Sequence, residues 1–296
     1  LPIRFLRIVR GVPMPPREVR QVANTDFGRS RNQLMREIIG YTPVQPDGSV
    51  KIKVPANVPL ALSLLDEKGQ RIGGRHQNWI TVKAGEVLTC NGCHTNTSEL
   101  PHGRKDAQAP SINSGAPVGG IPFNNATEAI IPDYGQTMAQ ADEMENGLAE
   151  LSSNLNYQDI WTNASISTVN TDYALTYAGL ETLAPNGSDC FLNWNAYCRI
   201  QINYVEHIQP LWELSRPVID ADTQELLTDN KCTSCHSPID EDNLARIALG
   251  QLDLSSSVSS DQPAHLTSYR ELFFNDDEQE VIEGIVTNRL IEVVDG

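Results

Sequence analysis

The sequence predicts an α+β protein with several domains: a small β-sandwich-like N-terminal domain, a loop-rich connecting region and a mainly helical C-terminal domain. The length of 296 residues is enough for two ordinary domains. Short apolar segments between turn sequences dominate the N-terminal part, whereas apolar residues at helical spacing recur from residue 201 onward. We therefore divide the chain into residues 1–100, 101–200 and 201–296.

Strand signals are concentrated in the N-terminal domain. Residues 49–54 alternate between apolar and polar side chains, which is typical of a half-buried strand, and Pro46-Asp47-Gly48 before them favours a turn. Helical content is expected here only near residues 31–39. The predicted strands are residues 4–9, 49–54, 60–65 and 79–82.

The connecting region and the C-terminal domain differ in composition. Gly, Pro, Ala, Asn and Ser dominate residues 101–134, which predicts a long loop, and residues 136–151 predict one acidic helix. In the C-terminal domain, Ile208 and Trp212 share one helical face, and Pro217 ends that helix. Further helices are predicted at residues 223–228, 240–249, 266–274 and 277–289.

The composition excludes several classes of partner. The formal net charge is −16 and the sequence pI is about 4.7. Such a field repels phosphate groups, which excludes nucleic acid and disfavours anionic membrane surfaces. The most apolar stretch, residues 54–65, is short and contains Pro55 and Pro59, so we expect no membrane span. Because the chain begins at Leu1 with strand-like residues, we expect it to belong to a longer protein.

Four of the six cysteines form two Cys-x-x-Cys-His motifs. Two thiols at this spacing can form thioether bonds to the vinyl groups of haem, and the following His then binds the iron as its proximal axial ligand. The sequence therefore predicts two covalently bound c-type haems. The residues that would attach the porphyrins are Cys90, Cys93, Cys232 and Cys235, and those that would bind iron are His94 and His236.

Zinc is the main alternative for these motifs, since Cys-x-x-Cys together with His also forms zinc sites. A structural zinc site needs four ligands, whereas each motif supplies three in sequence. Chance is a weaker alternative: with 6 Cys and 6 His in 296 residues, about 0.002 such motifs are expected per chain. Haem is therefore the favoured interpretation of both motifs.

Four further histidines are candidates for the second axial ligands of the two irons. For the second haem, His207 is the first candidate because it opens a predicted helix, and His265 is the second. For the first haem, His76 is the first candidate and His102 the second. The loop from the motif to His102 is short and would have to wrap tightly around the edge of the porphyrin. Bis-His ligation would close both irons and lower their potentials. Helix capping and simple surface exposure are the alternative roles for these side chains.

The remaining cysteines, Cys190 and Cys198, lie eight positions apart on either side of Trp194. We predict a disulfide between them, with a reduced buried pair as the alternative. Disulfides and covalently attached haem both point to a compartment outside the reducing cytosol. The expected location is therefore periplasmic or extracellular.

Two groups of short segments carry a resemblance to a known family. The first group is residues 35–38, 45–50, 54–59, 65–66 and 85–94. The second is residues 251–254 and 268–272, within a segment from 204 to 277. These segments resemble multidomain bacterial cytochromes similar to the α subunit of hydrazine synthase. The resemblance implies haem at both motifs and a C-terminal cytochrome c domain. A β-propeller often accompanies these domains, and this sequence has no propeller repeats.

In that family, hydrazine chemistry depends on an unusual first haem with a Tyr ligand and a nearby zinc ion, and the resemblance places no matching Tyr here. Our leading hypothesis is a di-haem electron carrier that exchanges electrons with redox proteins, among them other cytochromes or copies of itself. The first alternative is a redox enzyme with an open haem at His94 that the second haem supplies with electrons. The second is a subunit of a larger cytochrome assembly or filament.

Overall fold

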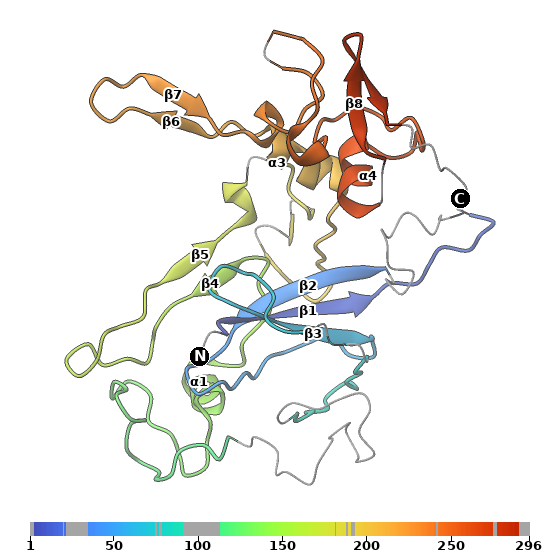
Figure 1. Cartoon of the computed structure of the whole chain (residues 1–296). Coiled ribbons are helices and arrows are strands. Elements are labelled where there is room, and N and C mark those ends of the chain that lie inside the picture. Colours follow the sequence, from blue (N-terminus) through green and yellow to red (C-terminus); the bar gives the residue numbers. More distant parts are fainter. Residues whose placement is uncertain are drawn as a thin grey trace, which may run out of the picture. The chain divides into compact units, whose positions relative to one another are not determined.

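The computed structural model of the chain contains two compact units, each with small sheets and few helices (Figure 1). The N-terminal unit comprises Leu1–Val12, Arg36–Tyr177 and Asn186–Ile200, and the C-terminal unit comprises Pro13–Met35, Ala178–Pro185 and Gln201–Gly296. The domain boundaries at residues 100 and 200 stay predictions. The structure describes residues 3–19, 21, 35–74, 76, 79–90, 113–180, 182–187, 189–190, 193–240, 242–274 and 277–289.

A three-stranded antiparallel sheet forms the centre of the N-terminal unit. Its strands are β1 (Phe5–Gly11), β2 (Arg36–Pro43) and β3 (Leu60–Leu65), in the order β2-β1-β3. β3 confirms the strand predicted at residues 60–65, and β1 confirms and extends the one predicted at residues 4–9. The β-rich character expected of the N-terminal part is therefore present.

The helix predicted near residues 31–39 is wrong over its second half, because β2 occupies that part of the chain. β2 pairs with β1 from Arg36 opposite Gly11 to Pro43 opposite Phe5. The pairing register shifts by one residue between Gly40 and Ile38, so that Ile39 is the extra residue of β2. Gly40 has a φ of 143°, in the region that favours glycine. Burial of the strand against β1 therefore outweighs the local helical preference of its first residues.

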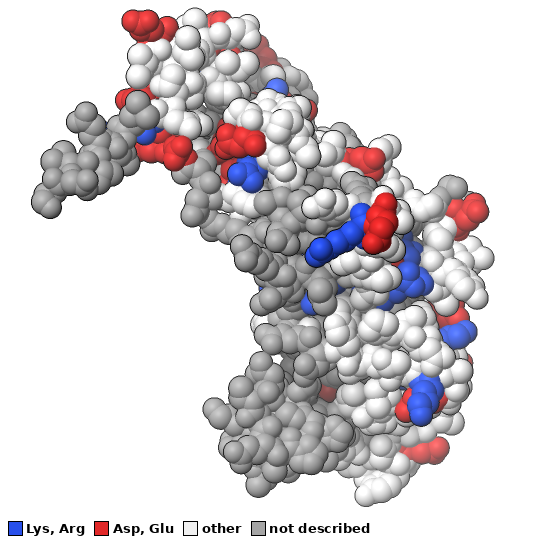
Figure 2. All heavy atoms as spheres, turned by 90° about the vertical axis from the view of Figure 1, so that its right-hand side faces the viewer, with Lys and Arg blue, Asp and Glu red and all other residues white. Residues whose placement is uncertain are grey.

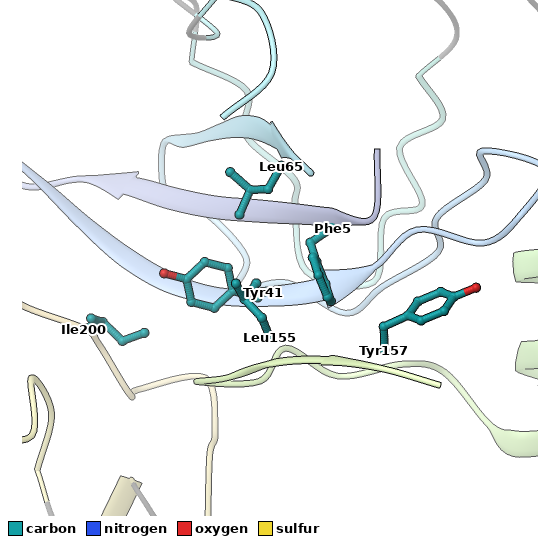
Figure 3. Close-up of a cluster of buried hydrophobic side chains, with 6 residues drawn as sticks. All are labelled: Phe5, Tyr41, Leu65, Leu155, Tyr157 and Ile200. Atoms are coloured by element: carbon teal, nitrogen blue, oxygen red, sulfur yellow. The ribbon is translucent and has the colours of Figure 1, made fainter. Parts of the chain in front are cut away.

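Hydrophobic clusters form on both faces of this sheet, because successive side chains of β1 alternate between them. Phe5 is buried in the first cluster, and Leu6 and Ile8 are buried in the second. β4 (Leu155–Tyr157) and β5 (Tyr173–Leu175) form a two-stranded sheet that contributes side chains to the first cluster. Figure 3 shows this cluster, which contains Phe5, Tyr41, Leu65, Leu155, Tyr157 and Ile200.

The acidic helix predicted at residues 136–151 is present as the shorter α1 (Met138–Asn146). Thr137 and Gln140 form a capping box at its start, and Gly147 ends it with a φ of 86°. The carboxylate of Asp47 accepts a hydrogen bond from the N–H of Met138 at 2.9 Å. The turn at residues 46–48 therefore helps to cap the helix. α1 also supplies Met138 to a third hydrophobic cluster.

The predicted disulfide between Cys190 and Cys198 is confirmed, with a Cα–Cα distance of 5.6 Å. Inside the loop that it closes, the indole N–H of Trp194 donates to the carbonyl of Ile39 in β2 at 3.1 Å. Arg199, next to the disulfide, donates to the carbonyl of Ala196 at 2.8 Å. The disulfide therefore fixes a loop that packs against the central sheet of its own unit.

The C-terminal unit consists of short elements. α4 (Thr267–Phe273) confirms the helix predicted at residues 266–274. Among the described residues of the whole chain, no helix has the length and hydropathy needed to cross a membrane. The other helices and strands described after residue 200 are η4 (Tyr204–Ile208), α3 (Gln209–Glu213), β6 (Pro217–Ile219), β7 (Leu226–Asp229), η5 (Cys232–Ser234), η6 (Leu249–Gln251), β8 (Gln279–Ile282) and β9 (Ile285–Asn288).

The expectation of a mainly helical C-terminal domain is therefore not met. The helices predicted at residues 223–228 and 277–289 are wrong, because each segment lies in a two-stranded hairpin: β6–β7 and β8–β9. β8 and β9 are joined by Glu283 and Gly284, whose φ values of 51° and 79° suit a tight hairpin turn. The Val, Ile and Thr residues of both hairpins favour strands.

Candidate haem-attachment sites

The first motif is described only at its beginning. Cys90 is exposed, and His76 is half-buried. Cys93, His94 and His102 lie outside the described residues. The arrangement of ligands around the first predicted haem therefore stays a prediction.

The second motif is described completely. η5 is a single turn of 3₁₀ helix, in which the N–H groups of Cys235 and His236 donate to the carbonyl of Cys232 at 3.2 and 3.0 Å. Neither thiol is buried: Cys232 is half-buried, and Cys235 is exposed. The tight turn therefore presents two accessible thiols directly before the histidine, as covalent haem attachment requires.

The turn is held from outside by a following segment of chain. The guanidinium of Arg246 donates to the carbonyl of Ser234 at 2.6 Å and to that of Ser237 at 3.1 Å. The N–H of Leu249 donates to the carbonyl of Cys235 at 3.0 Å. These bonds fix the motif backbone on both sides of its second thiol. Sequence reasoning missed Arg246, since nothing in the local pattern shows that it returns to the motif.

The ring of His236 is oriented by a backbone carbonyl. Its Nδ1 lies 3.2 Å from the carbonyl oxygen of Leu252. A carbonyl only accepts hydrogen bonds, so Nδ1 carries the ring proton and the lone pair is left on Nε2. Histidines that bind metals are commonly oriented by such a second hydrogen bond. The geometry of His236 therefore fits an axial ligand of haem iron.

His207 accepts a hydrogen bond at Nδ1, whereas His236 donates one from the same atom. The backbone N–H of Asn203 donates to its Nδ1 at 2.8 Å, so the neutral ring carries its proton on Nε2. The side chain of Asn203 in turn accepts from the N–H of Val205 at 2.9 Å. His207 thus takes part in the cap of η4, the alternative role considered for it. It would have to break this bond before Nε2 could bind iron.

His265 lies within a group of aromatic rings in the C-terminal unit. Its ring centroid is 5.0 Å from that of Tyr269 and 6.3 Å from that of Phe274, with which it is stacked. Tyr204 and Phe273 belong to the same group through ring contacts with Tyr269. The role of His265 as an iron ligand stays a prediction.

The described part of the chain contains no group of three or more His, Cys, Asp or Glu side chains placed to hold a metal ion. The two thiols and the imidazole of the second motif are therefore not gathered around one point. A structural zinc site would need four such ligands around one ion. The zinc alternative for this motif gains no support from its geometry.

The interior of the C-terminal unit is poor in apolar side chains. Among the described residues, the three hydrophobic clusters all lie in the N-terminal unit. Among described residues 201–289, the buried aliphatic side chains are Ala248 and Leu254, whereas Leu244 and Leu249 are 63% and 61% exposed. Its buried polar side chains are His207, Gln209, Asp253, Ser259 and Ser268.

Gln209 shows how this interior is organised. Its side chain donates to the carbonyl of Leu254 at 3.0 Å and accepts from the hydroxyl of Ser268 at 2.5 Å. The N–H of Leu254 donates to the carbonyl of His236 at 2.9 Å. Hydrogen bonds therefore connect α3 and α4 to the motif where apolar contacts would normally do so. A covalently bound porphyrin would supply the missing apolar surface.

Comparison with known families gives one match. The family described as hydrazine synthase alpha subunit middle domain matches residues 2–95, which include β1, β2, β3 and the first motif. Comparison with curated proteins and with solved structures gives no match. The match supports the family resemblance of the first third of the chain and does not extend to the second motif. The N-terminal part of this chain is thus similar to the middle domain of the hydrazine synthase alpha subunit.

Proposed function

We propose that this chain is a di-haem c-type cytochrome that transfers electrons outside the cytoplasm. Cys232 and Cys235 would attach one haem, with His236 as its axial ligand. Cys90, Cys93 and His94 would do the same for the other. A haem bound in this way supplies an iron centre that gains and loses one electron.

The observation that carries the proposal is the pairing of an oriented ligand with a missing core. The carbonyl of Leu252 leaves Nε2 of His236 free to bind iron, and the motif turn is held by Arg246. Around it, the described C-terminal unit has no hydrophobic cluster of its own. Covering one exposed Leu or Ile side chain with a porphyrin would stabilise the unit by about 2 kcal/mol. A covalent haem thus accounts for the sequence motif and for the sparse core together.

For the sixth ligand of the second iron, the geometry favours His265 over His207. His207 already accepts a backbone hydrogen bond at Nδ1, which places its proton on the nitrogen that would have to bind iron. Ligation by His265 would leave the hydrogen bond between Asn203 and His207 at η4 intact. The order that the sequence favoured for these two residues is therefore reversed in the proposal.

The location outside the cytoplasm is supported by the disulfide between Cys190 and Cys198, since disulfides persist in oxidising compartments. Redox proteins are the partners that such a carrier needs. The family match adds support for a protein that works with other subunits.

A redox enzyme is the second candidate function. The matched region includes the first motif, and the family that it resembles takes its name from a synthase. In this alternative the haem at His94 has an open coordination position where a substrate reaches iron, and the haem at His236 supplies electrons. The two functions differ in the ligation of the first iron.

Electron paramagnetic resonance of the oxidised protein tests the proposal. The carrier predicts two low-spin haems per chain and no binding of carbon monoxide to the reduced form. A His265→Ala variant should convert the second haem to high spin, whereas His207→Ala should leave it low spin. A high-spin signal in the unaltered protein that disappears on adding cyanide would favour the enzyme, and absence of any haem signal would refute both.

A further inference from the structure

The negative charge of this protein is concentrated at its C-terminal end. Residues 201–296 contain 19 Asp and Glu against five Lys and Arg, so they carry a formal charge of −14 out of the chain's −16. On the face shown in Figure 2, acidic side chains predominate over basic ones on the C-terminal unit. A field of this size attracts a basic protein and repels a second copy of the same unit.

Within this unit, the β6–β7 hairpin exposes large apolar side chains. Ile219 and Leu226 face each other across the strands, and the shift of register there leaves Leu227 without a direct cross-strand partner. Leu226 and Leu227 are each 62% exposed. The hairpin extends away from α3 in Figure 1, and its sheet contains only these two strands. An exposed apolar patch of this kind is typical of an interaction surface.

Acidic side chains surround the apolar residues of the hairpin. Asp220, Asp222 and Glu225 lie in or beside its turn, and residues 217–230 contain no Lys or Arg. The N–H groups of Thr223 and Asp222 donate to Asp220 and lower the pKa of its carboxyl. The hairpin therefore combines an apolar centre with a negative rim, which complements a partner with an apolar patch ringed by lysines.

The base of the hairpin is attached to the second haem motif. The carbonyl of Asp229 accepts from the hydroxyl of Ser234, inside the motif, at 3.3 Å. The carboxylate of Asp229 accepts from the N–H of Arg216 at 2.6 Å. Arg216 precedes β6, and its guanidinium lies 3.8 Å from the sulfur of Cys232. Hydrogen bonds thus join the base of the hairpin directly to the motif turn.

From these observations, and resting on the proposed haem at His236, we propose that the β6–β7 hairpin is the docking surface for a basic electron-transfer protein. In the complex, one electron passes between the iron bound by His236 and the redox centre of the partner. One centre is oxidised and the other is reduced, and no bond is formed or broken. The apolar residues hold the complex together, and the acidic rim guides the encounter.

Electron transfer to a basic cytochrome c of the mitochondrial type tests this surface, with that protein as the probe. The reduced full-length chain is mixed with the oxidised probe in a stopped-flow instrument at low and at high ionic strength. Two double variants are compared: one combines Leu226→Ser and Leu227→Ser, and the other combines Asp222→Lys and Glu225→Lys. Each should lower the second-order rate constant about tenfold at low ionic strength. The charge variant should also lose most of the dependence on salt.

The β8–β9 hairpin supplies a matched control. It also exposes apolar side chains, among them Val281 and Ile285, and no hydrogen bond joins its described residues to η5. The pair Val281→Ser and Ile285→Ser should react with the probe as the unaltered chain does. Equal loss of rate in both hairpins, or no loss in β6–β7, would overturn the docking surface.

Two further measurements separate this inference from the proposed function. Haem content and reduction by dithionite should be the same in every variant, so a fall in rate cannot arise from a lost cofactor. An unaltered chain without haem contradicts the proposed function, and the docking surface falls with it. A haem-loaded chain that forms dimers, dispersed by Leu226→Ser, would show that the hairpin binds a second copy and would overturn the basic partner.

Discussion

The two units of this protein are stabilised in different ways. The N-terminal unit buries apolar side chains on both faces of a three-stranded sheet and adds a disulfide. The C-terminal unit, over its described residues, connects its segments largely through buried polar groups such as Gln209 and Ser268. This difference supports the proposed haem, because a covalently attached porphyrin would supply apolar surface that the described part of the C-terminal unit lacks.

Charge follows the same division. Residues 1–200 contain 19 acidic and 17 basic side chains, whereas residues 201–296 contain 19 and five. In the N-terminal unit the charges are paired locally: Glu37 lies 2.9 Å from Arg10 and 3.6 Å from Arg199. The excess negative charge of the C-terminal part is therefore available to a partner rather than used within the fold.

The largest expected effect follows from removing the second haem. In a chain with Cys232→Ala and Cys235→Ala, the proposed second haem cannot be attached, so the C-terminal unit should lose the apolar surface that this porphyrin would supply. Hydrogen exchange should then lose its protection across residues 201–289 and keep it in β1, β2 and β3. Unchanged protection of both units would show that the C-terminal unit needs no cofactor.

A second prediction probes the apolar core of the N-terminal unit. Phe5 is fully buried in the first cluster, so Phe5→Ala should lower the free energy of unfolding of this unit by about 3–5 kcal/mol. Urea unfolding followed by circular dichroism measures the change. The control is Leu175→Ala in β5, where the side chain is exposed and the expected change is small. The absorbance of the second haem should be the same in both variants.

The disulfide gives a smaller effect in the same unit. Replacing Cys190→Ser and Cys198→Ser opens a short loop and should destabilise the fold by about 2–3 kcal/mol. The fluorescence of Trp194 should shift to longer wavelength as its hydrogen bond to Ile39 is exchanged for water. Peptide mapping without reduction checks the pairing itself, and alkylation of both thiols in the native protein would refute it.

The smallest predicted effect concerns a single carboxyl in the N-terminal unit. Burial raises the pKa of Asp159, but hydrogen bonds from the N–H groups of Thr162 and Asn170 outweigh it and hold the pKa at about 2, below the usual 3.8. Its stabilising contribution is therefore present above pH 3.8 and is lost as pH falls through 2.

Asp159→Asn should accordingly destabilise the unit by about 1 kcal/mol near pH 5, allowing for solvent screening, and have no effect below the folded pKa. Urea titrations at both pH values measure the difference. A variant that is equally destabilised at both would show that the side chain acts through packing and not through its charge.

Local sequence patterns predicted only part of this structure. The chain spacing of Cys190 and Cys198 and the residues of β3 were sufficient for correct predictions. The sequence predicts helices at β7 and across β8–β9 because the apolar spacing there suits both structures. The turns of the two hairpins decide the matter, through the positive φ values of Gln224 and Glu283, which apolar periodicity does not reveal.

For the candidate site, the sequence predicts a chemistry but not the groups that surround the motif. Five consecutive residues predict the thiols and the axial histidine of the proposed second haem. The carbonyl of Leu252 and the guanidinium of Arg246 reach the motif only because the chain returns to it, and no local pattern encodes that return. For His207 the sequence offers capping only as an alternative to ligation, because it does not show that the N–H of Asn203 donates to the ring.

Peptide mapping of the purified chain, produced in a host that attaches haem, tests the central claim most directly. Cleavage after Lys and Arg releases residues 84–104 and 232–246, each with one complete motif. We predict that each peptide carries the mass of one haem and absorbs in the Soret region. Two unmodified peptides whose thiols react with an alkylating agent, together with zinc in the native protein, would contradict the account.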